Sequence, residues 1–212
     1  MNSNEIKTLK RTLSLSKRQK EMLVGLVLGD GHLETSDNGR TYRLKVEHCM
    51  EQEEYVHWLH EEFREWVRGE PYIKVRTSGQ RSIGFTTYAH GAFRFFAQQF
   101  YASGTKRMPD MLPKLLTPLG LALWYLDDGS RKSREHTTYV IHAVGYTKRE
   151  LGCAQQALAA LGVATSLHKQ PKHTWRIYVL SRSAERFRSL IEPHVEHLAT
   201  MSYKLDNTLP KE

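Results

Sequence analysis

The chain has 212 residues, of which 40% are hydrophobic and 25% are charged, a composition typical of a folded globular protein and not of a disordered one. Its 31 Lys and Arg residues outnumber its 23 Asp and Glu residues, and the formal charge of +8 favours a polyanionic partner over a membrane surface. The two cysteines form no CxxC pair, and no apolar stretch reaches the ~20 residues of a membrane span. We therefore expect a soluble, intracellular protein of a bacterial cytoplasm or an organelle, without a disulfide framework, a zinc cluster or a membrane partner.

The first predicted element is an apolar helix that begins near Ser16 and ends at Asp30. Ser16 lies three residues before Gln19, which is the spacing of a capping box at the start of a helix. From Leu23 to Leu28 apolar side chains occupy the whole circumference, so we expect this helix to be buried on several sides, including against a second helix. Residues 1–15 are interpreted as a basic N-terminal extension.

The rest of the first half predicts strands and amphipathic helices in alternation. Residues 42–47 alternate apolar and charged side chains, which predicts a strand with one wet face, and a shorter strand should precede it. The later elements are predicted as a helix over 53–67, strands over 72–77 and 81–88 around a turn at 78–80, and a helix over 90–101. A linker at 107–116 follows, so the first half is assigned to residues 16–106.

The second half of the chain repeats the pattern of the first. The segment that ends in Asp30 has a counterpart 98 residues later that ends in Asp128, and Lys106 and Lys204 share this separation. Duplication of a unit of about a hundred residues would leave such matches. The elements predicted for residues 117–212 are a helix that starts at Thr117 and Pro118, a strand over 138–144, a helix over 148–161, strands over 166–170 and 174–180, and a helix over 183–197. Together the halves predict an α+β fold with the order α-β-β-α-β-β-α in each half.

Asp30 and Asp128 are candidates for a metal site. A carboxylate at the C-terminal end of a helix faces the negative end of the helix dipole, which costs about a few tenths of a kcal/mol or more. If the two helices pack side by side, the carboxylates converge and provide hard oxygen ligands suited to Mg²⁺, which would activate a water and neutralise a phosphate. An Asp-Gly pair is also a common helix stop, but two copies in register favour the functional interpretation.

Lys106 and Lys204 allow two interpretations. Isolated lysines are usually solvated surface residues, whereas a shared separation suggests a role near a scissile phosphate, in which they stabilise charge or orient water. The sequence leaves both interpretations open.

Basic and polar residues follow one face of several predicted strands. A twisted sheet with such a face fits a DNA groove, where its side chains could read base edges, although each residue is also compatible with an ordinary solvated strand. The loop after the second motif is better placed for phosphates. The strand candidates are Arg43, Lys45, Lys74, Arg76, Arg81, His142, His168, Lys172 and Arg176, and the loop candidates are Arg131, Lys132 and Arg134.

The two apolar segments resemble the paired signatures of the LAGLIDADG homing endonucleases, specifically the single-chain branch with two motifs. The matching segments are residues 23–31 and 121–129. The resemblance extends to Thr117-Pro118-Leu119 before the second motif, to the Lys106 neighbourhood and to residues 201–205, so it covers nearly the whole chain.

This resemblance implies two pseudo-symmetric halves whose motif helices pair at the interface and whose antiparallel sheets form a saddle over the major groove. Asp30 and Asp128 would bind two or three Mg²⁺ ions, replaceable by Mn²⁺, together with the backbone carbonyls of Gly29 and Asp127. Lys106 and Lys204 would be the basic residues of two active sites. The implied reaction hydrolyses one phosphodiester in each strand of a long DNA target, across the minor groove, and leaves short 3′ overhangs.

The second motif departs from the first at two positions. Leu123 stands where the first motif has Gly25, and Asp127 stands where it has Gly29, which calls equal activity of the two sites into question. The alternative functions are an RNA-binding intron-splicing maturase on the same scaffold, with or without residual cleavage, and a DNA-binding regulator, for which no residues are left to form an extra helix-turn-helix domain. The expected partner is double-stranded DNA, with intron RNA under the alternative, and the expected state is a monomer.

Overall fold

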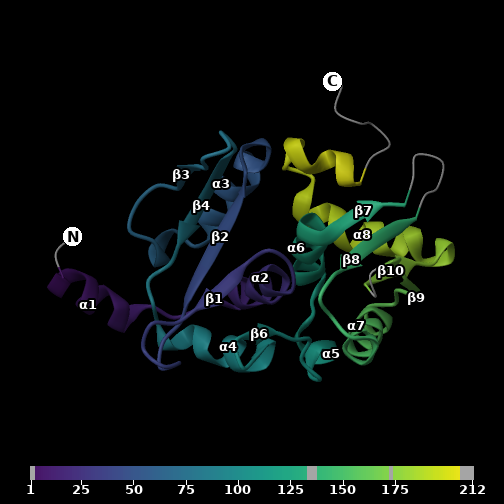
Figure 1. Ribbon diagram of the computed structural model, residues 1–212, viewed down its shortest axis with the longest axis horizontal. Helices are drawn as coiled ribbons and strands as arrows, with labels where there is room; N and C mark the ends of the chain where they lie inside the picture. Colours follow the sequence, from purple (N-terminus) through teal and green to yellow (C-terminus); the bar gives the residue numbers. More distant parts are fainter. Residues whose placement is uncertain (1–2, 133–137, 172–173, 206–212) are drawn as a thin grey trace. The chain divides into compact units, whose positions relative to one another are not determined.

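The computed structural model describes residues 3–132, 138–171 and 174–205. Contacts divide the chain into two compact units (Figure 1). Unit 1 contains Met1–Lys20 and Gly31–Gln98, and unit 2 contains Glu21–Asp30 and Gln99–Glu212. The end of the first motif therefore belongs to the same unit as the second motif. In the described ranges no helix is long and apolar enough to cross a bilayer.

Unit 1 is built on a four-stranded antiparallel sheet in the order β1-β2-β4-β3. The residues of β2 alternate between buried and more exposed positions, as the period of two in its sequence predicts. Helix α3 covers the buried face, because its Tyr55 ring lies 5.2 Å from that of His48 and its His60 ring lies 5.6 Å from that of Phe85. The elements around this sheet are α1 (Ser3–Thr12), β1 (His32–Glu34), β2 (Arg43–Cys49), α3 (Glu53–Glu62), β3 (Tyr72–Val75), β4 (Arg81–Thr86) and α4 (Arg94–Phe100).

Unit 2 contains a second antiparallel sheet with the equivalent strand order, β7-β8-β10-β9. Helix α8 packs on its buried face, where the Phe187 ring lies 5.0 Å from that of Tyr139 and 5.2 Å from that of Tyr125. The elements of this part are β7 (Gly129–Arg131), β8 (Tyr139–Ala143), α7 (Lys148–Ala160), β9 (Thr165–Lys169), β10 (Trp175–Val179) and α8 (Ala184–Val195).

The two motif helices are α2 (Lys17–Leu28) and α6 (Pro118–Asp128), and the part of α2 from Glu21 onward packs closely against α6 within unit 2. A Cβ atom added to Gly25 would touch the carbonyl oxygen of Gly120 and lie 2.8 Å from the Cβ of Leu123. Every residue in the runs 22–28 and 119–126 is buried. The expected burial of both motif helices, including against another helix, is therefore confirmed.

The order of elements confirms the predicted fold class. One half runs α2-β1-β2-α3-β3-β4-α4 and the other α6-β7-β8-α7-β9-β10-α8, which is α-β-β-α-β-β-α twice. The helix starts are also confirmed, because Ser16 and Gln19 exchange hydrogen bonds of 3.0 and 3.1 Å, and the Thr117 hydroxyl accepts from the Gly120 N–H at 3.2 Å. The short leading strands β1 and β7 are present in both halves.

Two helix predictions in unit 1 were too long. The helix predicted over 53–67 ends at Glu62 and continues as a 3-10 turn, because the Phe63 N–H bonds to both the Leu59 and His60 carbonyls and Trp66 turns inward against Phe93. The helix predicted over 90–101 likewise begins with a 3-10 turn before α4.

Three short elements were not predicted. Residues 3–12 form α1, the linker range 107–116 contains helix α5 (Leu112–Leu115), and Lys106 lies in a small hairpin of β5 (Tyr101–Ala102) and β6 (Thr105–Lys106). Positive backbone φ angles of 49° at Ser103 and 80° at Gly104 form its turn. The boundaries of the extension, halves and linker stay predictions.

Candidate active site

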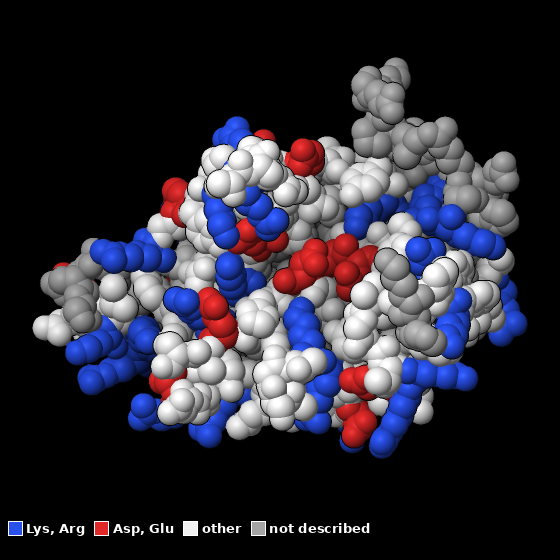
Figure 2. Space-filling view, viewed as in Figure 1, with Lys and Arg blue, Asp and Glu red and all other residues white. Residues whose placement is uncertain are grey.

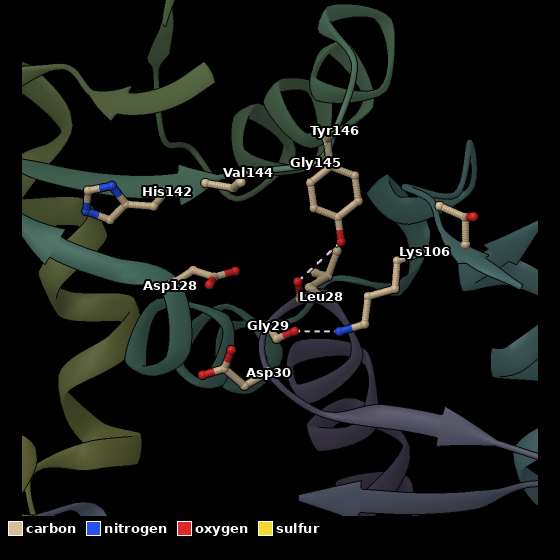
Figure 3. A pocket seen from close by; sticks show the side chains of 10 residues that line it. Leu28, Gly29, Asp30, Lys106, Asp128, His142, Val144, Gly145 and Tyr146 are labelled. Atoms are coloured by element: carbon tan, nitrogen blue, oxygen red, sulfur yellow. Dashed lines mark hydrogen bonds between the residues drawn. The ribbon is translucent and has the colours of Figure 1, made fainter. Parts of the chain in front are cut away.

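The C-terminal ends of both motif helices line one pocket in unit 2, with a volume of about 340 Å³ (Figure 3). Asp30 and Asp128 lie in it together with Lys106. Its other lining residues are Leu28, Gly29, Thr105, His142, Val144, Gly145 and Tyr146. The structure thus brings together both predicted acids and one of the two predicted lysines.

The two acids are held in different ways. Asp128 is the last residue of α6 and is half-buried, and the following N–H of Gly129 still donates to the Tyr125 carbonyl. Asp30 lies in the turn after α2 and is exposed, and its backbone N–H donates to Oδ2 of Asp127 at 2.9 Å. Helical hydrogen bonding therefore positions Asp128, whereas a side chain of the other motif positions Asp30.

The charges around Asp128 shift the pKa of its carboxyl group in opposite directions. Burial raises the pKa of Asp128 to about 7, with further contributions from the negative charges of Asp127 and Asp30, while the Lys106 ammonium lowers it. Carboxylates that disfavour one another's ionisation in a confined site are stabilised by a bound cation. The pocket therefore has the electrostatic character of a cation site.

Replacing Asp128 with Asn is expected to stabilise the metal-free protein by about 1–2 kcal/mol at pH 8 and by less than half of that at pH 5, which lies only about one pH unit above the ordinary pKa of an aspartate. Because the folded-state pKa of about 7 lies above the ordinary 3.8, the folded protein binds the additional proton, and its unfolding free energy falls as the pH rises through this window. The full difference corresponds to about 4 kcal/mol, which we discount because Asp128 retains solvent contact. Urea unfolding in EDTA at both pH values measures the effect, and equal stabilisation at pH 5 and pH 8 would contradict it.

The two predicted lysines make equivalent contacts. Lys106 Nζ donates to the carbonyl oxygen of Gly29 at 2.6 Å, and Lys204 Nζ donates to those of Asp127, at 3.3 Å, and Leu126. Gly29 and Asp127 are the residues directly before the two acids, so the 98-residue repeat extends to this contact. Burial lowers the pKa of Lys106, although the nearby carboxylates counteract it. Lys204 is buried, so neither residue is an ordinary solvated lysine.

At the two positions where the motifs differ, the glycine of the first motif packs against the larger residue of the second. A Cβ atom on Gly29 would lie 2.8 Å from Cγ of Asp127, just as one on Gly25 would lie 2.8 Å from Cβ of Leu123. Each of these two glycines of the first motif therefore leaves room for the larger side chain at the equivalent position of the second motif. The same packing that breaks the symmetry also brings the Asp127 carboxylate to Asp30.

Tyr146 is a site residue that the sequence did not reveal. Its hydroxyl donates to the Leu28 carbonyl at 3.3 Å in the wall of the pocket (Figure 3). Burial, assisted by the charge of Asp128, raises the pKa of this hydroxyl well above its ordinary value. Tyr146 lies between β8 and α7, where nothing in the local pattern separates it from a common loop tyrosine.

Three predicted DNA-binding residues form a row across the unit 2 sheet. Arg176 of β10 pairs in register with His142 of β8 on one side and with His168 of β9 on the other. His142 also bonds to Ser130 at 2.9 Å, and burial, together with the charges of Arg176 and Lys204, lowers the pKa of its imidazole. His142 thus connects this sheet face to the pocket.

The unit 1 sheet carries predicted residues on both faces. Arg43, Lys45 and Lys74 share the face opposite α3, which we call the basic face. Arg76 follows β3 beside this face, where its guanidinium lies 3.9 Å from Glu47. Arg81 pairs with Val75 and alternates onto the opposite face, although its side chain is exposed.

The loop predicted after the second motif is partly a strand. Arg131 belongs to β7, and its register partner Tyr139 is buried against α8, so Arg131 lies on the helix-covered face and not in a loop. Lys132 directly after it is exposed. Arg134 and Lys172 lie outside the described residues.

Comparison with known proteins agrees with this fold. The model of the LAGLIDADG DNA endonuclease family matches residues 20–187, so the chain belongs to this family, and the predicted resemblance is confirmed. A similar solved structure is that of the homing endonuclease I-WcaI bound to its DNA recognition sequence, with a TM-score of 0.87 and 26% identity over 98% of this chain and 95% of that chain.

Two further proteins are similar to this chain, one named as an endonuclease and the other as a maturase. The probable intron-encoded endonuclease 1 of Wickerhamomyces canadensis is 28% identical over 217 residues, covering 96% of this chain and 91% of that protein. The cytochrome b mRNA maturase bI2 of Debaryomyces hansenii is 26% identical over 205 residues, covering 91% of this chain and 75% of that protein.

Proposed function

We propose that this chain is a site-specific homing endonuclease that makes a double-strand break in a long DNA target and leaves short 3′ overhangs. The observation that carries the proposal is the convergence of Asp30 and Asp128, at the ends of paired helices, on one pocket that also holds Lys106. Carboxylates repel phosphates, so a protein that only binds nucleic acid gains nothing from them at this place. The I-WcaI complex supports double-stranded DNA as the partner.

The donor groups of the pocket fit a hard divalent cation. We propose Mg²⁺, in two or three positions and replaceable by Mn²⁺, held by the carboxylates of Asp30 and Asp128 and the carbonyl oxygens of Gly29 and Asp127. The raised pKa of Asp128 supports this, because excess negative charge stabilises a bound cation. When bound, the cation would activate a water and neutralise charge on the scissile phosphate.

The lysines complete the proposed machinery. Lys106 is in the pocket, so its ammonium group can stabilise charge that develops on the phosphate. Lys204 is buried behind the second motif and holds the backbone that presents Asp128. We propose that Lys106 acts on the substrate and Lys204 mainly through position.

Lys106→Met is expected to slow cleavage about a hundredfold, because it removes one charged donor from the pocket, and to cost less stability than the change at Lys204, because Lys106 is only half-buried and bonds to one carbonyl. Lys204→Met should slow cleavage and also destabilise the protein by about 1–3 kcal/mol, because two carbonyl groups lose a buried partner. Single-turnover cleavage and urea unfolding measure the two effects. The control is Lys114→Met, an exposed lysine of α5, and equal losses in all three variants would contradict the assignment.

DNA recognition is proposed for the exposed sheet faces. Arg43, Lys45 and Lys74 would read base edges from the basic face of unit 1, and the row of Arg176, His142 and His168 from the unit 2 sheet. The further candidates are Arg76, Arg81 and Lys132 and, outside the described residues, Arg134 and Lys172, whereas Arg131 on the helix-covered face is not proposed to read bases. We also propose that the protein is a monomer, because one chain carries both motifs. We further propose that its gene lies within an intron, as the name of the intron-encoded endonuclease of Wickerhamomyces canadensis says of that relative.

Selection from a random duplex library tests the proposed function directly. The protein is incubated with the library in Mg²⁺, and cleaved molecules are recovered and sequenced, with a parallel Ca²⁺ incubation in which bound molecules are recovered. Homing endonuclease activity predicts one long recurrent sequence in both arms, with staggered 3′ ends only in Mg²⁺. Binding without cleavage in Mg²⁺ would overturn the nuclease assignment.

An RNA-splicing maturase is the second candidate, and the similarity to the maturase of Debaryomyces hansenii favours it. The same sheet faces would then bind a folded intron RNA. Splicing of the host intron with and without the protein, compared between wild type and Asp30→Asn, separates the functions. A maturase role predicts that splicing survives this substitution.

A further inference from the structure

An acidic residue lies in the middle of the basic face of unit 1. Glu47 follows Lys45 by two residues in β2, so both side chains point to the same face. Its register partner in β4 is Gly84, which pairs in turn with Tyr72 of β3. Over this part of unit 1, Figure 2 shows basic side chains close around acidic ones.

Both carboxylate oxygens of Glu47 have donors from neighbouring residues. Oε1 accepts a hydrogen bond of 3.0 Å from the Ser82 hydroxyl and lies 3.9 Å from the Arg76 guanidinium. Oε2 lies 3.5 Å from the Tyr72 hydroxyl and 3.5 Å from the Lys45 ammonium. One carboxylate therefore connects two basic side chains and two neutral donors, which come from three strands and from the residue that follows β3.

The backbone beside Glu47 leaves room for this arrangement. A Cβ atom on Gly84 would lie 3.1 Å from the Tyr72 hydroxyl and 3.1 Å from Cα of Glu47, and it would also touch the Val46 carbonyl. Only glycine at this position lets the Tyr72 ring cross the strand without displacing it. The cluster thus depends on a residue with no side chain.

Glu47 remains charged in this environment. Burial acts to raise its pKa, but the Ser82 hydroxyl and the charges of Lys74 and Lys45 lower the pKa below its ordinary value. Its side chain is 17% exposed, against 37% for Lys45 and 56% for Arg76. The basic groups are thus the more accessible members of the cluster, and the carboxylate lies beneath them.

We propose that Glu47 is a positioning residue for specificity, which holds Lys45 and Arg76 in fixed orientations and keeps them from engaging the phosphates of any DNA sequence. This inference rests on the proposed DNA-binding function. A free Lys or Arg adds a sequence-independent phosphate contact, whereas one held by a carboxylate engages only where base edges match its geometry. Glu47 thereby lowers non-specific affinity more than specific affinity.

Glu47→Gln tests this proposal, because it keeps the shape and removes the charge. Binding of random-sequence and library-selected duplexes is measured in Ca²⁺ at several salt concentrations. The expected results for the variant are about fivefold tighter non-specific binding, a salt slope steeper by about 1 to 2 ions, and an about tenfold smaller specificity ratio. Non-specific affinity and slope equal to those of wild type would overturn the proposal.

Two controls separate the positioning effect of Glu47 from the general effect of removing one negative charge from the protein. Glu61→Gln removes the same charge from an exposed position on α3 and is expected to change non-specific affinity less than about twofold. In an Arg76→Gln background the effect of Glu47→Gln should shrink, because one of the two restrained side chains is already absent. Equal effects of Glu47→Gln and Glu61→Gln, or an undiminished effect without Arg76, would contradict positioning.

A second variant and a second measurement apply if Glu47→Gln does not fold or if selection yields no target. If Glu47→Gln does not fold, Ser82→Ala removes the hydrogen bond that fixes Oε1 without any change of charge, and it should lower the specificity ratio about threefold. An unchanged ratio would then count against the proposal. The salt slope on random duplex needs no preferred site, so it reports on Glu47 even if selection yields no target and the proposed function fails.

Discussion

Asp30→Asn and Asp128→Asn are each expected to lower double-strand cleavage by about a thousandfold or more, while DNA binding in Ca²⁺ changes less than about threefold. A thousandfold corresponds to about 4 kcal/mol of transition-state stabilisation, which is the scale expected for loss of a charged metal ligand. Binding should persist, because the basic residues on both sheets are untouched and one charge that repels phosphate is gone. Single-turnover cleavage of the selected duplex and a filter-binding titration measure the two quantities.

Asp110→Asn provides the matched control for both variants. Asp110 is an exposed acid of unit 2 outside the pocket, and its only described partner contact is the Cys153 thiol at 3.7 Å. Its replacement should leave cleavage within about twofold of wild type. Cleavage at wild-type rate by the double variant of Asp30 and Asp128 would remove the basis of the proposed function.

Gly25→Ala is expected to destabilise the protein by about 3 kcal/mol, despite the higher helix propensity of alanine. The added Cβ atom would meet the carbonyl oxygen of Gly120, a backbone atom that cannot move aside without shifting α6. Because both active-site acids lie at the ends of these helices, cleavage should fall as well. Urea unfolding followed by circular dichroism measures the stability change.

Gly152→Ala is the same substitution at a position with open space. Gly152 lies inside α7, and an added Cβ atom there would meet nothing within 4 Å. Helix propensity alone then acts, and we expect stabilisation of up to about 1 kcal/mol. If both variants were stabilised, the close approach of α2 and α6 would be wrong.

The repeat made the fold and the acids predictable from sequence. A separation of 98 residues between Asp30 and Asp128 implied two similar halves, and the all-round apolar character of the residues before each acid implied buried, paired helices. These signals are local or periodic, so they can be read from the amino-acid sequence alone. The contact of Lys106 with Gly29 was hinted at only by the shared separation of Lys106 and Lys204.

The sequence could not show contacts that depend on how side chains turn in space. Tyr146 reaches the pocket from a loop, and Glu47 lies among basic residues contributed by other strands, so neither is marked by its neighbours in sequence. Arg131 was assigned to a loop, because a three-residue strand is too short to show alternation. The helix over 53–67 was extended too far, because an aromatic residue in a 3-10 turn keeps the helical period.

A crystal structure with the selected duplex and Mn²⁺ would show directly which residues bind the metal, because Mn²⁺ gives an anomalous signal at its own position. We expect anomalous peaks bound by the carboxylates of Asp30 and Asp128 beside a phosphate of each strand. Peaks only at other residues, with both carboxylates free of metal, would contradict it.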